Sequence, residues 1–469
     1  MNTSIRNIAL CLCAVLFLQA CASGRKPAPT PPPPAEPVHP GKEIGRQFLL
    51  EARKQYRFVT DQDVNNAVKN MGRRIVLAAG QNPDDYQFFV VEQIQPNAFA
   101  IPGGYIFIFD GLLARMETED ELAGVLAHEV AHVVHNHFFK DAPAVTALGM
   151  ATIAAILLSR GSGAATSIAM ATNIAAQLKF SRTHEEEADR SAVKYLERSG
   201  YGTDGLAKFL SRLSEYEDIH GYDFPPYLST HPILQERIHM AELRSERTPT
   251  SAGPVTSPVI GDWERVRVKV RGRLKPESPA EWVVGKKVLE ESDAGRKSYL
   301  TGLAHLSAGR TAEAATDFLN AVEEDPQNPF YRGELAWTYL KGRKAEAARR
   351  EAEKSLELSG GGPEPEAALL VMGMIGINEG NYKEAGDSLE RLVRTNPGHS
   401  MGHYQLGQAY YKTGESLLGA YHTGRYLRLS LQTAAALQEL KKARKLSEEG
   451  SEMAKLIQKE IDGIRLHGV

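Results

Sequence analysis

Cysteine is almost absent from this chain of 469 residues, and the three that occur, Cys11, Cys13 and Cys21, all lie near the N-terminus. They fall within or just after an apolar run preceded by Arg6, which is typical of a secretory signal. The remainder of the chain therefore has no thiol from which a disulfide can form. An excess of charge of either sign is also missing, because the formal net charge is only −3. This balance gives no support to a nucleic-acid partner.

The first 40 residues predict export and attachment rather than a folded domain. Residues 18–21 read Leu-Gln-Ala-Cys, which resembles a bacterial lipobox and implies cleavage after residue 20 and lipidation of Cys21. The Pro-rich stretch that follows predicts an extended tether over residues 21–40, after a signal peptide at 1–20. Because Ala22 rather than Asp follows the cysteine, the resemblance implies a lipid anchor in the outer membrane, facing the periplasm.

Residues 128–132 read His-Glu-Val-Ala-His and lie in an otherwise apolar helical run. Since a helix turns about 100° per residue, His128 and His132 project from one face and Glu129 lies beside them. Ionisable side chains in an apolar helix are normally paired or bound to a metal. The spacing is typical of a zinc site with His128 and His132 as ligands and Glu129 as the general base.

A catalytic zinc site needs a third protein ligand. His135 shares the helix face of His132, but no glycine breaks the helix there and position 138 is Phe, so the three-histidine spacing of the metzincins is absent. A carboxylate cluster at the start of a second expected helix offers a better candidate. Glu185 can complete the ligand set, and Asp189, one turn later, can accept the free ring N–H of a ligand histidine.

At this point four motifs, in order, resemble the zinc metallopeptidases related to the CAAX prenyl protease and to the bacterial heat-shock protease HtpX. Besides the His-Glu-Val-Ala-His helix, they are residues 97–104, which read Asn-Ala-Phe-Ala-Ile-Pro-Gly-Gly, the segment from Glu185 to Asp189, and Thr-His-Pro at 230–232 followed by Arg237. The resemblance implies one Zn²⁺ per chain, with Glu185 as the third ligand and Asp189 behind the ligands.

Two of these motifs leave alternatives open. His231 and Arg237 can stabilise the oxyanion that forms when water attacks a peptide carbonyl, or His231 can occupy the fourth zinc position and hold the enzyme latent. The Pro-Gly-Gly turn leads into residues 105–109, a β-branched and aromatic strand. This strand can pair with an extended peptide through its backbone, or it can be an ordinary hairpin strand.

An apolar, Ala-rich stretch runs from residue 142 to 159, and a second one reaches residue 178. The first stretch has a proline near its start and several glycine or small polar positions, and it is short for a hydrocarbon core of ~30 Å. We therefore expect a helical cap or an interfacial flap over the active site rather than a membrane-spanning hairpin.

A repeated pattern begins after residue 294. Gly309, Gly342 and Gly380 each open the pattern Gly-x-x-x-Glu-Ala, at spacings of 33 and 38 residues, and a degraded copy starts at Gly414, a further 34 residues on. Periodicity near 34 residues with these glycines and alanines resembles tetratricopeptide repeats. Such helix pairs stack into a solenoid that commonly holds a partner protein.

Together these patterns predict a mostly α protein. A zincin-like α+β metallopeptidase domain with a small sheet is expected at 41–247, a linker and connecting region at 248–294, and an α-helical tetratricopeptide-repeat solenoid at 295–469. The sequence resembles the periplasmic, repeat-bearing branch of the family. The expected function is that of a zinc metalloendopeptidase that acts on unfolded or misassembled proteins in the quality control or assembly of outer-membrane proteins, with the repeats recruiting the assembly proteins.

The alternative is a repeat-based chaperone or assembly scaffold whose zinc site is latent or structural. A filled fourth zinc position would favour this alternative. Glu129 argues against a purely structural metal, because a scaffold has no use for a general base.

Overall fold

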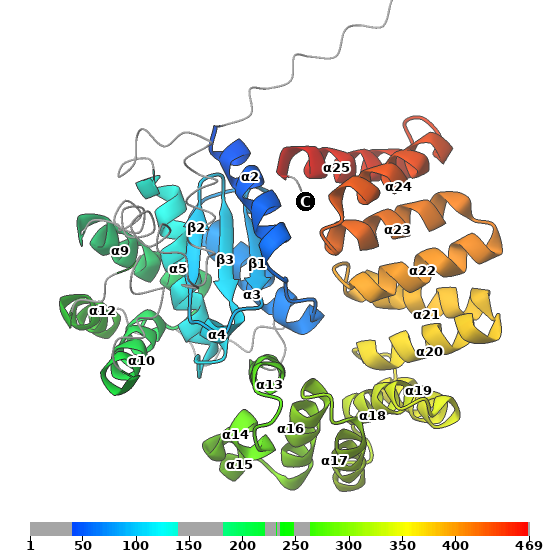
Figure 1. Ribbon diagram of the computed structural model, residues 1–469. Helices are drawn as coiled ribbons and strands as arrows, with labels where there is room; N and C mark the ends of the chain where they lie inside the picture. The colour runs from blue at the N-terminus through cyan, green and yellow to red at the C-terminus, as the bar shows by residue number, and fades with distance from the viewer. Residues whose placement is uncertain (1–39, 139–181, 221–230, 232–234, 248–262, 468–469) are drawn as a thin grey trace, which may run out of the picture. The chain divides into compact units, whose positions relative to one another are not determined.

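The computed structural model describes residues 40–138, 182–220, 231, 235–247 and 263–467 (Figure 1). The predicted signal peptide, the lipidation site Cys21, the tether up to residue 39 and the Ala-rich stretches between 142 and 178 lie outside these residues. Among the helices that are described, none combines the length and the apolar character that crossing a bilayer requires.

A small sheet and the helices around it form the first part of the described chain. The elements are α2 (Pro40–Gln55), α3 (Gln62–Ala78), the 3-10 helix η1 (Pro83–Asp85), β1 (Gln87–Val91), β2 (Ala98–Ile101), β3 (Tyr105–Phe109), α4 (Asp110–Leu113), α5 (Glu119–Val134), α9 (Arg182–Ser199), α10 (Gly205–His220) and α12 (Gln235–Arg247). The predicted α+β domain with a small sheet is confirmed.

The three strands lie in the order β1-β3-β2, with β1 parallel and β2 antiparallel to the central β3. Side chains alternate along β3, because successive residues of a strand point to opposite faces. Phe107 packs in an aromatic cluster with Phe48 of α2, their ring centroids 5.1 Å apart. Ile106 and Ile108 are buried on the other face, in the core that also holds residues of α3 and α5. The sheet therefore supports the helix that carries the His-Glu-Val-Ala-His motif.

Residues 105–109 form the central strand, so of their two interpretations the hairpin strand is correct. β3 pairs with a neighbour on each side and has no edge left for a substrate peptide. β2 pairs only with β3 among the described strands, and it packs against α5. The edge that can accept an extended peptide near the metal-binding helix is therefore that of β2.

Helix α13 (Trp263–Leu274) lies within the predicted connecting region and has two packed faces. Trp263, Val266 and Val270 are buried in the core that contains α3 and α5, whereas Val268 is buried with the first repeat helices. The Trp263 indole Nε1 donates a hydrogen bond to the carbonyl oxygen of Glu117, 3.1 Å away. The described part of this region is thus a packed helix that belongs to both cores.

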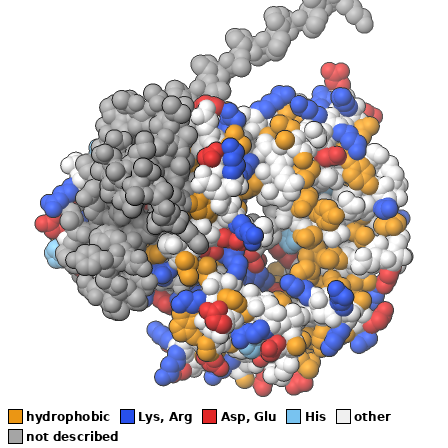
Figure 2. Space-filling view, viewed as in Figure 1, with side chains coloured by type: hydrophobic (Ala, Val, Ile, Leu, Met, Phe, Trp, Pro, Cys, Tyr) orange, Lys and Arg blue, Asp and Glu red, His pale blue; other side chains and the backbone are white. Residues whose placement is uncertain are grey.

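Helices occupy the rest of the chain and pack pairwise along it (Figure 1). They are α14 (Ala280–Val284), α15 (Lys286–Glu291), α16 (Ala294–Ser307), α17 (Thr311–Glu324), α18 (Pro329–Lys341), α19 (Ala345–Ser359), α20 (Glu366–Glu379), α21 (Tyr382–Thr395), α22 (Ser400–Thr413), α23 (Ser416–Leu429), α24 (Thr433–Leu446) and α25 (Glu452–His467). Figure 2 shows side chains of both charges mixed with apolar ones over these helices. The predicted repeat helices are confirmed.

The repeated glycines mark the turn inside each helix pair. Gly309, Gly380 and Gly414 have φ angles of 78°, 84° and 88°, in the left-handed region that only glycine adopts without strain. Gly342 is not left-handed, and the next residue, Arg343, takes a φ of 59° in its place. The recurrent Gly of the sequence pattern is therefore a turn signal in three of the four pairs.

Candidate metal centre

Helix α5 carries three of the predicted site residues. It begins after Thr118, whose side chain accepts a hydrogen bond from the backbone N–H of Glu121 at 3.3 Å. The Glu121 carboxylate accepts from the backbone N–H of Glu117 at 3.0 Å, one residue before the usual partner in a capping box. This start places His128 and His132 one turn apart, buried in the domain core.

Four predicted residues from three parts of the chain meet in a buried group. The Nε2 atoms of His128 and His132 lie 2.9 Å apart, and His231 Nδ1 lies 3.2 Å from His128 Nε2. Glu185 Oε1, from α9, lies 3.4 Å from His132 Nε2 and 3.1 Å from His231 Nδ1. One atom of each residue therefore faces a shared point, which is the arrangement a metal ion requires.

These residues fit a zinc ion. Four ligand atoms about 2.0–2.1 Å from a tetrahedral zinc lie roughly 3.3 Å from one another, close to the separations observed. Three imidazoles and one carboxylate are also the ligand types that zinc prefers. Without a cation, four ligand atoms would be crowded together in a region that water does not reach, so the chemistry of the group also favours a metal.

Asp189 and Arg237 lie behind this group and hold it in place. Asp189 Oδ1 lies 2.9 Å from His128 Nδ1, so the carboxylate can accept the ring N–H and leave Nε2 free to bind a metal. Arg237 donates to both oxygens of Asp189, from Nε at 2.8 Å and from Nη2 at 2.9 Å. Its Nη1 lies 2.7 Å from Glu185 Oε2. Because its guanidinium nitrogens contact buried carboxylates, the geometry favours a positioning role for Arg237 over contact with an oxyanion.

The Glu129 carboxylate is fully buried beside the four residues. No side chain of a described residue forms a hydrogen bond with its oxygens, the backbone of Ala100 in β2 lies beside them, and His231 Nε2 lies 3.5 Å from Oε1. Burial raises the pKa of Glu129, although His231 and His128 nearby oppose this shift. A buried carboxylate with a raised pKa and no side-chain hydrogen bond is suited to accept a proton from a water molecule.

Metal binding is expected to depend on pH through His128. Burial alone would lower the pKa of this ring, but its hydrogen bonds with Asp189 and Glu185 outweigh burial and raise the pKa to about 9. Below that pH both nitrogens of the metal-free ring are protonated, and a metal ion has to displace the proton on Nε2. Burial lowers the pKa of His132, so a proton on that ring does not compete with the metal ion in this pH range. Between about pH 6 and pH 8, apparent zinc affinity should rise roughly tenfold per pH unit. Competition with a chelator of known affinity measures this slope, and a flat profile would contradict it.

The sequence analysis did not include His137, which lies against the metal group. Helix α5 ends at Val134, and Asn136 adopts a left-handed conformation with φ of 52°. This turn brings His137 Nδ1 to 2.9 Å from His132 Nδ1, on the side of that ring away from the metal. Asn136 is the sequence signal for this turn, because Asn is, after Gly, the usual residue in a left-handed helix cap. His135 does not join the four-residue group.

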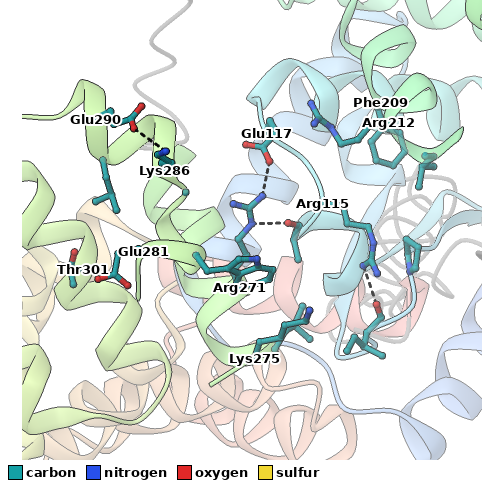
Figure 3. A pocket seen from close by; sticks show the side chains of 18 of the residues that line it. Arg115, Glu117, Phe209, Arg212, Arg271, Lys275, Glu281, Lys286, Glu290 and Thr301 are labelled. Atoms are coloured by element: carbon teal, nitrogen blue, oxygen red, sulfur yellow. Dashed lines mark hydrogen bonds and ion pairs between the residues drawn. The ribbon is translucent and has the colours of Figure 1, made fainter. Parts of the chain in front are cut away.

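A pocket lies apart from the metal group and includes none of its residues (Figure 3). Its volume is about 1340 Å³, and residues of α10, α13, α14 and the loops around α4 contribute to its lining. Arg271 crosses it to reach the Glu117 carboxylate at 2.9 Å and the Ala114 carbonyl oxygen at 2.8 Å. The exposed Trp282 stacks under Lys275 at the same pocket.

Both parts of the chain match models of known protein families. Residues 62–245 match the model of peptidase family M48, and residues 286–329 and 334–400 match the model of the tetratricopeptide repeat. The first match contains every residue of the metal group. The predicted combination of a metallopeptidase domain and tetratricopeptide repeats is therefore confirmed.

Curated relatives cover different shares of the chain. A protein of Vibrio cholerae is 27% identical over 299 residues, which are 61% of this chain and 61% of the relative, less than two thirds of its length. The beta-barrel assembly-enhancing protease of Escherichia coli K12 is 24% identical over 383 residues, 78% of this chain and 76% of that protein. A mitochondrial metalloendopeptidase of Schizosaccharomyces pombe is 30% identical over 175 residues, 37% of this chain and 51% of that protein.

Proposed function

We propose that this chain, a peptidase family M48 domain followed by tetratricopeptide repeats, is a zinc-dependent endopeptidase of the bacterial cell envelope. The observation that carries the proposal is the buried group of His128, His132, Glu185 and His231, with the buried carboxylate of Glu129 beside it. A structural zinc site needs the first four residues but not the fifth. Glu129 therefore points to hydrolysis.

The residues of the site divide the work of peptide hydrolysis. When bound by the histidines and Glu185, zinc supplies a Lewis acid that polarises the peptide carbonyl and makes water more acidic. Glu129 takes a proton from the attacking water and later passes it to the leaving amine. Asp189 holds His128 in the required tautomer, and Arg237 holds Asp189 and Glu185 in turn.

His231 can either fill the fourth zinc position or stabilise the oxyanion. Its Nδ1 lies on the metal side, 3.2 Å from His128 Nε2, which supports the interpretation that it fills the fourth position of a latent enzyme. Its Nε2 lies toward Glu129, so His231 occupies space that water and substrate need. We propose that His231 moves away from the metal when substrate enters, and that the ring then lies where it can stabilise the oxyanion.

Extended, unfolded polypeptide is the proposed substrate. The edge of β2 that no described strand covers can pair with such a chain, and a small cavity beside it is lined by Ala100 and Ile101 of this strand together with His132. Backbone pairing reads no particular side chain, so it suits clients that share only an unfolded state. A folded β-barrel has no free strand to offer.

The relative in Escherichia coli supports a place in outer-membrane protein assembly. We propose that this chain removes misassembled outer-membrane proteins, that its repeats recruit the assembly proteins, and that a lipid on Cys21 anchors it to the outer membrane in the periplasm. A scaffold with a latent zinc site remains the second candidate, because His231 lies on the metal side of the group.

The test uses the purified chain in detergent, stripped of metal with a chelator and then given zinc. Without metal it should leave an unfolded outer-membrane β-barrel protein intact, and one equivalent of zinc should restore cleavage. The same β-barrel protein folded in micelles should resist. Cleavage by the metal-free chain would overturn the proposal. Zinc binding with no cleavage of either form would favour the scaffold.

A further inference from the structure

A second group of metal-binding side chains lies next to the first. His135 and His137 follow the end of α5, and Glu187 lies on α9 between them. Glu187 Oε2 lies 2.9 Å from His137 Nε2, and Oε1 lies 3.3 Å from His135 Nδ1. His137 is buried, whereas 26% of the His135 side chain and 39% of the Glu187 side chain are exposed. The group therefore has one buried ligand, His137, and two ligands that reach solvent.

Each of the three residues offers one ligand atom, and these atoms lie within 4.8 Å of one another. Glu187 contacts His137 through Oε2 and His135 through Oε1, so its carboxylate can bind a metal ion between the two rings through one oxygen or through both. Ser191 Oγ lies 2.8 Å from His135 Nε2, which leaves Nδ1 of that ring directed toward Glu187. Two imidazoles and one carboxylate favour Zn²⁺ or a similar transition metal over Ca²⁺ or Mg²⁺, which prefer oxygen. The exposed side leaves room for water as a further ligand.

This outer group shares a hydrogen bond with the inner one. With zinc held by His132 Nε2 as proposed, the Nδ1 of that ring would carry the proton and donate it to His137 Nδ1, 2.9 Å away. As an acceptor at Nδ1, the neutral His137 ring carries its own proton on Nε2 and donates it to Glu187. The chain from Glu187 through His137 to His132 thus orients a ligand of the inner metal, as such partners do in many zinc sites.

A metal on the outer group would reverse these hydrogen bonds. With a metal on Nε2, the neutral His137 ring has to carry its proton on Nδ1. Two N–H groups, from His132 and His137, would then face each other across 2.9 Å, and one ring has to turn away. Occupation of the outer group therefore disturbs the inner ligand, and by linkage the inner metal weakens binding of the outer one.

We propose that His135, His137 and Glu187 form an outer, inhibitory site for Zn²⁺, weaker than the catalytic site, whose occupation breaks the hydrogen bond that orients His132. The binding half of this inference stands on the geometry of the three residues. The inhibitory half rests on the proposed zinc peptidase. The consequence is an enzyme that works with the first zinc ion and is slowed when zinc is abundant.

The experiment counts zinc on the full chain by equilibrium dialysis and elemental analysis. His135→Ala removes an outer ligand but keeps the hydrogen bond between His137 and His132. His239→Ala is the matched control, because His239 is an exposed histidine of α12 outside both groups. Wild type and the His239→Ala variant should bind one zinc ion more than the His135→Ala variant. The first and tighter ion should be unaffected in all three, which also shows that each has folded.

Equal zinc counts in wild type and the His135→Ala variant would overturn the outer site and leave the proposed function standing. Cleavage is then measured as zinc is raised through the second binding event. Wild type should lose on the order of tenfold in rate, as for other disturbed partners of zinc ligands, and the His135→Ala variant should not. Equal inhibition of both would overturn the inhibitory half. Absence of cleavage by every variant, at normal zinc counts, would count against the proposed function instead.

Discussion

A chain carrying Glu129→Gln is expected to bind zinc as tightly as the wild type and to cleave unfolded protein about 10²- to 10⁴-fold more slowly. Gln keeps the size of Glu129 but cannot accept a proton, and Glu129 is not one of the four residues that face the metal. The loss should therefore fall on kcat rather than on zinc affinity. Both are measured on the same preparation, at equal zinc occupancy.

Glu119→Gln provides the matched control. Glu119 lies in the first turn of the same helix, ten residues earlier and so about 15 Å along the axis from Glu129. Its substitution should leave cleavage within about twofold of wild type, because its side chain lies far from the metal group and Gln keeps its size. If the Glu129→Gln variant retained more than a tenth of wild-type kcat, proton transfer by Glu129 would be refuted.

Arg237→Ala should destabilise the metal-free chain by about 3–5 kcal/mol, the usual cost of removing one partner from a buried ion pair. Arg237 is only 3% exposed, and it is the cation beside two buried carboxylates, Glu185 and Asp189. Burial would raise the pKa of Asp189, but Arg237 and His128 hold it down at about 2, so the carboxylate stays charged. Denaturant unfolding followed by circular dichroism measures the loss, and added zinc should recover part of it.

Arg73→Ala is the control for this substitution. Arg73 pairs with Asp84 at 3.0 Å, but the two side chains are 39% and 61% exposed. Exposed ion pairs contribute about 0–1 kcal/mol, so the free energy of unfolding should hardly change. A loss of cleavage by the Arg237→Ala variant without any loss of stability would restore the interpretation that Arg237 contacts the oxyanion directly.

Spacing within helices is what made the site predictable. His128 and His132 are one turn apart, and so are Glu185 and Asp189, so each pair shares a face whatever the rest of the fold does. The structure brings these faces together through the packing of α5 on α9. The α+β domain and the repeat helices were likewise accessible, because periodic glycines and apolar residues report local structure.

What the sequence could not provide depends on contacts between distant segments. Nothing within residues 105–109 indicates whether the strand is central or at an edge, because that depends on where β1 and β2 are placed. The role of Arg237 could not be read from the sequence either, because its partners Asp189 and Glu185 lie 48 and 52 residues away. His137 is different, because the left-handed turn at Asn136 that positions it is local, although it lacks the glycine that usually marks such a turn.

The family match ends at residue 245, but the hydrophobic core of the peptidase domain does not. Trp263, Val266 and Val270 of α13 fill that core, while Val268 on the same helix fills the core of the first repeats. Any truncation before residue 263 would leave a hole in the catalytic domain, and any fragment starting after 274 would expose apolar repeat surface. One helix thus closes two cores, so a substitution on either face of α13 can affect the peptidase domain and the first repeats together.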